Sequence, residues 1–95
     1  MIQQLTLDAI RAESALSENR RGPLKDPERG LLILMEVAGG LAAAIQAITR
    51  PLGYTEDTRM NAVREAIQVA SVAAQLIELL ERCKQEPNHR PAGGR

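Results

Sequence analysis

Apolar residues recur along this chain at helical spacing, in three segments separated by short polar breaks. In the first segment, residues 2–17, they alternate at steps of three and four, which places them on one face of a helix. This apolar stripe consists of Ile2, Leu5, Ala9, Ala12 and Leu16. A cluster of Asn, Arg, Gly and Pro at residues 19–23 predicts that the helix ends there.

The second segment begins with clear helix-start signals. Asp26 can accept hydrogen bonds from free amides as an N-cap, and Pro27 suits the first helical position because its missing N–H costs nothing there. We expect this helix to run to about Thr49, where Pro51 and Gly53 follow.

The third helix is predicted over residues 56–84. Thr55 offers its N-cap, and acids at the next two positions suit the positive end of the helix dipole. Two prolines and a glycine pair in residues 85–95 predict a flexible tail. The sequence therefore predicts a single all-α domain over residues 1–84, with no strand.

The second and third helices are apolar around most of their circumference. On the second, at 100° per residue, large side chains form one stripe and smaller residues the opposite face. The stripe is Leu31, Leu34, Met35, Ala38, Leu41, Ala42, Ile45 and Ile48, and the opposite face is Ile33, Glu36, Gly40, Ala43, Ala44 and Ala47. The third helix keeps only a narrow polar band for water, namely Arg64, Gln68, Ser71, Gln75, Glu78 and Arg82.

Helices this apolar belong at the centre of a larger assembly than three helices of one chain provide. We expect two copies to pair their second and third helices into a four-helix-bundle core, as a homodimer or a higher homo-oligomer. The alternative is a monomeric three-helix bundle with surplus alanine on its surface. A membrane span over residues 30–49 is long enough but disfavoured, because Glu36, Gln46 and many small residues lie inside it.

Composition narrows the function classes. Lys plus Arg and Asp plus Glu each number 12, so the basic surface expected of a nucleic-acid binder is not predicted. Cys83 is the only cysteine, which fits a reducing, cytoplasmic compartment. Asp8 and Glu13 interrupt the apolar stretch that a signal peptide would need. His89 stands alone in the predicted tail, so neither a Cys/His metal cluster nor a Ser/His/acid set is predicted.

Glu36 is the best functional lead, because it is the only charged residue between Arg29 and Arg50. A carboxylate in such an apolar helix loses its hydration unless it gains a partner, a metal or an exposed edge. Pairing with Arg29 or Arg64 across a helix interface is the plain structural alternative.

Two stretches resemble a known family. Residues 30–48, GLLILMEVAGGLAAAIQAI, and residues 61–81, NAVREAIQVASVAAQLIELLE, are similar to the all-α nucleoside triphosphate pyrophosphohydrolases of the MazG-like group. Members of that group carry E-E-x-x-E on one helix and E-x-x-D on the next. The likeness covers about half of the chain.

The resemblance implies a Mg²⁺ site in which carboxylates from two neighbouring helices bind the ion. The ion would then bind nucleotide phosphates and help activate water, which gives a monophosphate and pyrophosphate. On this resemblance the metal ligands are Glu36, Glu65 and Gln68. Val37 and Gly40 stand where the family has its other two glutamates, and Gln68 replaces the aspartate.

Two function classes therefore stay open. One is a small Mg²⁺-dependent nucleotide pyrophosphohydrolase with an incomplete acidic site. The other is a non-catalytic helical oligomerisation or interaction module that keeps the bundle without the chemistry.

Two further motifs have two interpretations each. The basic residues Arg20, Arg21 and Lys25 are either a solvated loop or a contact to nucleotide phosphates. For Gly39 and Gly40 a close helix crossing is favoured over a phosphate loop, because no strand precedes them.

Overall fold

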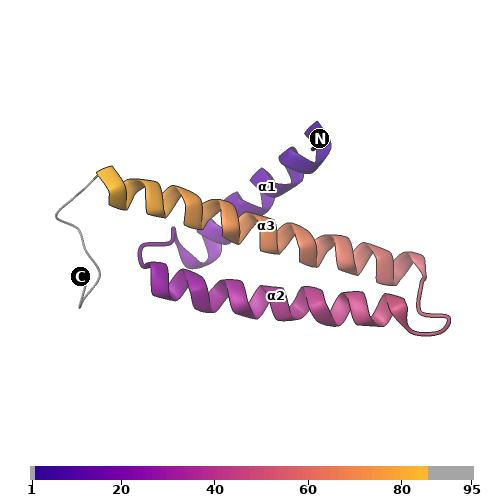
Figure 1. The fold of residues 1–95 in the computed structure, drawn as a ribbon. Coiled ribbons are helices and arrows are strands. Elements are labelled where there is room, and N and C mark those ends of the chain that lie inside the picture. The colour runs from indigo at the N-terminus through magenta and orange to yellow at the C-terminus, as the bar shows by residue number, and fades with distance from the viewer. Residues whose placement is uncertain (1, 86–95) are drawn as a thin grey trace.

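A computed structural model describes residues 2–85, which form three helices (Figure 1). They are α1 (Gln4–Arg21), α2 (Pro27–Thr49) and α3 (Glu56–Gln85). No strand occurs within these residues, so the all-α prediction is confirmed. The predicted bounds of α2 are confirmed, and α3 runs one residue further than predicted. The predicted tail from residue 86 onward, with His89, lies outside the described residues.

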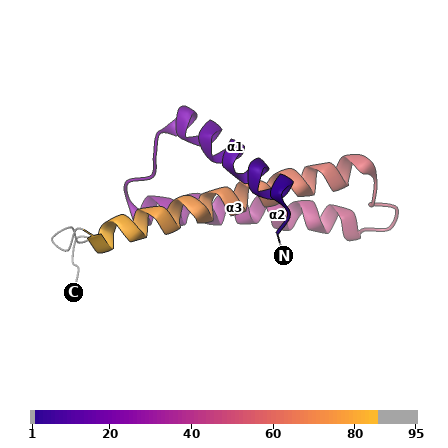
Figure 2. The same ribbon diagram turned by 90° about the horizontal axis from the view of Figure 1, so that it is seen from above.

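The helices α2 and α3 form an antiparallel hairpin, and α1 packs across α3 (Figures 1 and 2). Contacts of α1 are made with α3 rather than with α2. The side of the hairpin opposite α1, which is the front face in Figure 1, has no described helix over it. The chain therefore covers only one side of its own hairpin.

Small residues let α2 and α3 approach closely. Gly30 and Ala44 of α2 are buried, and a side chain at Gly30 would overlap the Leu76 side chain of α3. From α3, Val72 and Leu79 are buried. Part of the predicted small-residue face of α2, including Gly40 and Ala44, thus lies against α3 of the same chain, whereas Glu36 and Ala43 of that face are exposed.

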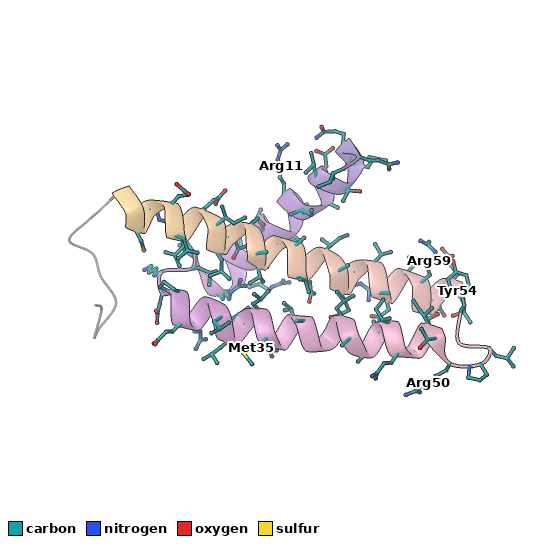
Figure 3. All side chains as sticks on the ribbon, in the orientation of Figure 1. Arg11, Met35, Arg50, Tyr54 and Arg59 are labelled. Atoms are coloured by element: carbon teal, nitrogen blue, oxygen red, sulfur yellow. The ribbon has the colours of Figure 1, made fainter. Side chains whose placement is uncertain are left out.

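Most of the large apolar stripe of α2 lies outside this interface. Leu34, Leu41 and Ile48 are half-buried, whereas Met35 is 63% exposed and points away from α3 (Figure 3). Only five apolar side chains among residues 2–85 are buried, namely Leu24, Ala44, Ala62, Val72 and Leu79. By length and composition α2 could cross a membrane, and only 6% of its most apolar 18-residue window is buried within the chain. The single chain leaves its most apolar helix largely uncovered.

The end predicted for α1 is wrong by four residues. The helix continues to Arg21 and ends at Gly22, whose φ of 81° suits glycine and whose N–H donates to the Glu18 carbonyl at 2.8 Å. The predicted apolar stripe is also largely exposed, with Leu5 and Leu16 facing solvent. The buried side chain of α1 is instead Ser17.

The polar band of α3 is only partly left to water: Arg64, Glu78 and Arg82 are exposed as predicted, but the prediction is wrong for the middle of the band. Ser71 is fully buried and Gln75 is 5% exposed. The Gln75 amide donates to the Ser14 carbonyl of α1 at 3.5 Å and accepts from the Arg21 guanidinium at 3.0 Å. For Gln75 these hydrogen bonds replace those to water, whereas the buried Ser71 hydroxyl has no hydrogen-bond partner among the described residues.

Both predicted helix caps are confirmed. The Asp26 carboxylate accepts from the Glu28 N–H at 3.1 Å, next to Pro27 in the first turn of α2. The Thr55 hydroxyl accepts from the Thr58 N–H at 3.1 Å, and the Thr58 hydroxyl accepts from the Thr55 N–H at 2.9 Å. These reciprocal bonds satisfy free amides at the start of α3.

The turn between α2 and α3 contains a strained residue. Leu52 adopts a φ of 58°, and its side chain is 99% exposed. A left-handed backbone costs a non-glycine L-residue about 1–2 kcal/mol. We therefore predict that Leu52→Gly raises the free energy of unfolding by up to about 1 kcal/mol, after the entropy cost of glycine is subtracted.

Urea unfolding followed by circular dichroism measures this effect. The matched control is Leu52→Ala, which keeps the Cβ and should give no comparable gain. A Leu52→Gly variant no more stable than Leu52→Ala contradicts the assignment of strain to Leu52.

Candidate functional site

Glu36 lies on an exposed edge of α2, where its carboxylate keeps access to water. It lines an open cleft of about 270 Å³ together with Gln68 of α3 and arginines from α1 and α2. We call this space the Glu36 cleft. Among the described residues Glu36 makes no ion pair within 4.0 Å, so pairing with Arg29 or Arg64 is not observed. The sequence left three environments open for this carboxylate: a charged partner, a metal or an exposed edge. The structure supports the exposed edge.

Glu65 is half-buried on α3 and packs against the backbone of α2. An added Cβ at Gly40 would overlap the Glu65 carboxylate oxygen and come within 3.4 Å of its carboxyl carbon. Gly40 lies four residues after Glu36, which is about one helical turn. Gly40 therefore leaves room for the Glu65 carboxylate of the neighbouring helix.

Gln68 is half-buried and lines the Glu36 cleft, one helical turn after Glu65 on α3. The structure thus brings Glu36 and Gln68 together in one cleft, whereas Glu65 does not line that cleft and lies against Gly40. Within residues 2–85 no group of three or more His, Cys, Asp or Glu side chains is placed to hold a metal ion. Two carboxylates and an amide oxygen suit a Mg²⁺ ion that keeps several waters, and do not form a closed cage.

The arginines near Glu36 differ in their partners. Arg20 pairs with Glu13 at 3.4 Å, whereas Arg21 donates to the neutral amide of Gln75 at 3.0 Å. Both arginines belong to the last turn of α1, so their prediction as loop residues is wrong. Lys25 lies in the connection between α1 and α2.

Sequence reasoning missed two participants in this region, Glu13 and Gln75. Glu13 was visible only as an acid on α1, and Gln75 was assigned to the solvent-facing band of α3. Glu13 reaches Arg20 along α1 itself, two helical turns away, whereas the crossing of α1 over α3 brings Gln75 to Arg21. A Ser and a Gln four residues apart, at 71 and 75, are a weak signal for a polar helix contact, and it does not identify the partner.

Comparison with protein-family models, curated proteins and solved structures finds no match to this chain. The MazG-like resemblance therefore stays a prediction, based only on residues of α2 and α3.

The contact between Gly40 and Glu65 predicts different effects of alanine at two adjacent glycines. Alanine favours a helix over glycine by about 1 kcal/mol. Space around Gly39 is open in the single chain, so the effect of Gly39→Ala should not depend on the residue at position 65. At Gly40 the same gain is opposed by overlap with the Glu65 carboxylate. Gly40→Ala should therefore stabilise the protein more in a Glu65→Ala background than in the wild type.

Urea unfolding of both double-mutant cycles, at one protein concentration, measures the two coupling energies. We expect about 1 kcal/mol between positions 40 and 65, and none between 39 and 65. Equal coupling at both glycines would show that the Glu65 side chain does not rest on Gly40.

Proposed function

We propose that this chain is a helical homo-oligomerisation module in which two copies pair their α2–α3 hairpins into a four-helix core. One observation carries the proposal: the most apolar helix of the chain has only 6% of its apolar window buried. Burial of a Leu or Met side chain contributes about 1.5–3 kcal/mol when it is complete. Several half-exposed side chains on one surface therefore supply a substantial driving force for association.

The exposed apolar residues lie on both helices of the hairpin. On α2 they continue from one end of the helix to the other, with small residues in the middle. We define the pairing surface as Leu31, Leu32, Met35, Ala38, Gly39, Ala42 and Ile45 of α2, with Ala66, Ile77 and Leu80 of α3. Exposed large and small residues that alternate along a helix are suited to helix-on-helix packing.

A second copy fits this surface better than a lipid bilayer. Insertion of α2 into a membrane would carry α3 with it, because the two helices pack side by side. The exposed charged residues of α3 include Arg64, Glu78, Glu81 and Arg82. Charged side chains are costly in hydrocarbon, whereas at a helix-bundle interface they can stay at the wet rim.

A second copy also presents the same apolar surface, so each chain covers what the other exposes. Two-fold pairing of identical surfaces is the commonest route to a soluble oligomer. At the centre of α2, Ala38, Gly39 and Ala42 allow two helix axes to approach closely. Pairing would enlarge the hydrophobic core, which has five buried apolar side chains in the single chain.

The pairing surface can be tested with charge substitutions at its centre. Ala38 and Ala42 are exposed in the single chain, so Ala38→Glu/Ala42→Glu should leave the helices intact. We predict a dimer or higher oligomer for the wild type and a monomer for this variant, because buried unpaired carboxylates oppose association. Sedimentation velocity over a range of protein concentrations measures the mass of each.

The control variant is Ala12→Glu, which makes the same chemical change at an exposed alanine of α1. It should keep the wild-type mass. A wild type that stays monomeric in buffer at every concentration overturns the proposal. Flotation of that monomer with lipid vesicles would assign the surface to a membrane instead.

A second candidate function is Mg²⁺-dependent hydrolysis of nucleoside triphosphates to monophosphates and pyrophosphate. The observation that favours it is that Glu36 and Gln68 line one cleft with three arginines. In this candidate Glu36 and Glu65 hold the ion, with Gln68 as a neutral ligand or a water-holding group. When bound, Mg²⁺ would polarise phosphate oxygens and activate water.

Pyrophosphate release with a panel of ribo- and deoxynucleoside triphosphates, titrated with Mg²⁺ or Mn²⁺, tests this candidate. Glu36→Gln should reduce turnover at least about tenfold, because it removes one of two charged ligands. Glu28→Gln, an exposed acid in the first turn of α2, is the matched control and should keep activity. If Glu36→Gln and the wild type behave alike, the catalytic function is wrong and the oligomerisation module stands alone.

A further inference from the structure

We propose that Arg21 and Arg29 bind a phosphate group in the space between the end of α1 and the first turns of α2. Two adjoining clefts open there: the Glu36 cleft and a cleft of about 290 Å³ at the α1–α2 corner. Arg21, Arg29 and Ile33 line both. The inference depends neither on the pairing of two chains nor on a metal ion.

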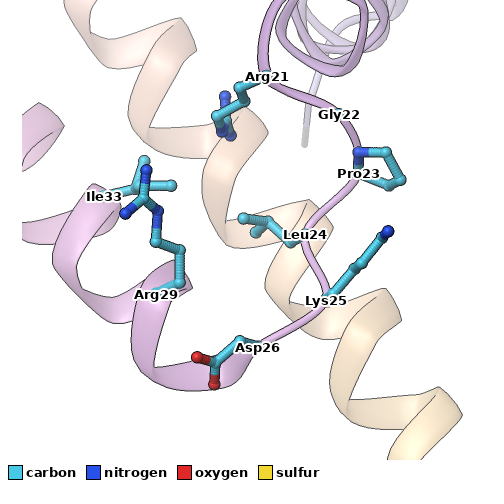
Figure 4. Close-up of a pocket in the computed structure, with 8 residues that line it drawn as sticks. All are labelled: Arg21, Gly22, Pro23, Leu24, Lys25, Asp26, Arg29 and Ile33. Carbon is cyan, nitrogen blue, oxygen red and sulfur yellow. The ribbon is translucent and has the colours of Figure 1, made fainter.

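Two guanidinium groups enter this space from different helices. Figure 4 shows the side chains of Arg21, at the end of α1, and Arg29, in the first turns of α2, reaching into the same space above Leu24. Neither arginine has a carboxylate within 4.0 Å among the described residues. Two like charges directed into one cleft repel each other unless an anion lies between them.

The Arg21 guanidinium is held in place by a neutral group. Its hydrogen bond at 3.0 Å goes to the amide oxygen of Gln75, which is itself buried and donates to the Ser14 carbonyl at 3.5 Å. A carboxylate at that position would orient Arg21 and neutralise it as well. Gln75 orients the side chain and leaves its full positive charge for a ligand.

The other charged groups of the region are used elsewhere or face another part of it. Glu13 pairs with Arg20 at 3.4 Å. The Asp26 carboxylate accepts from the Glu28 N–H as the N-cap of α2. Lys25 also lines the corner cleft, and its side chain extends away from Arg21 and Arg29 (Figure 4). Glu36 lines the Glu36 cleft and not the corner cleft, so the corner keeps an excess of positive charge.

The chemistry of the two arginines favours phosphate as the ligand group. A guanidinium donates two parallel N–H bonds to two oxygens of a phosphate, and a tetrahedral phosphate can accept from two such groups at once. The adjoining clefts are near the lower end of the size range of small-molecule sites. They leave room for a phosphate that is free or attached to a larger molecule such as a nucleotide.

Isothermal titration without divalent metal, at one fixed low ionic strength, tests the site. The probes are inorganic phosphate, pyrophosphate and a nucleoside triphosphate. Loss of a hydrogen-bonded charged donor typically corresponds to about a tenfold weaker affinity or more. We expect Arg21→Gln and Arg29→Gln each to weaken binding of the probes about tenfold, and the double variant to abolish measurable binding.

The matched control is Arg11→Gln/Arg64→Gln, which removes the same two charges from exposed positions outside both clefts. It should bind like the wild type. Equal affinity for inorganic phosphate and nucleotide would show that the site recognises a phosphate group alone. Tighter binding of the nucleotide would show that it recognises a nucleotide phosphate. Both results support the proposal. It is overturned if the wild type binds none of the probes, or if the control loses as much affinity as Arg21→Gln/Arg29→Gln.

Discussion

The structure depends on one imbalance: α2 has more apolar surface than α3 can cover. The residues of α2 that are buried are the small Gly30 and Ala44, and several of its large side chains, including Leu31, Leu32 and Met35, are left exposed. The third element, α1, adds no cover, because it packs on α3. We propose that a second copy of the chain, which presents a matching surface, covers this hydrophobic surface.

The helices themselves could be predicted from local signals. Asp26 with Pro27, and Thr55 with the acids after it, fix the starts of α2 and α3 through bonds to their own first turns. The end of α1 was misjudged because residues 19–21 are tolerated in a helix that a glycine ends one residue later. Local chemistry thus determines where these helices begin, and less sharply where they end.

Which faces are buried could not be predicted, because that depends on how the helices cross. Periodicity identified the small-residue face of α2 but not which helix covers it. For the same reason the sequence predicted that Gln75 faces solvent, although α1 crosses α3 at this residue and buries it. At the candidate site the sequence identified Glu36 and Gln68, which line one cleft, whereas Arg21 and Gln75 meet only through the α1–α3 crossing.

The most direct test of the central claim is a search for contacts between copies of α2. A sample mixed from isotope-labelled and unlabelled chains, observed by isotope-filtered nuclear Overhauser spectroscopy, detects only contacts between different chains. The account predicts intermolecular signals from the methyl groups of Leu31, Met35 and Ile45, which are exposed in the single chain. Their absence from a concentrated sample, with all signals of these methyl groups arising within one chain, would contradict it.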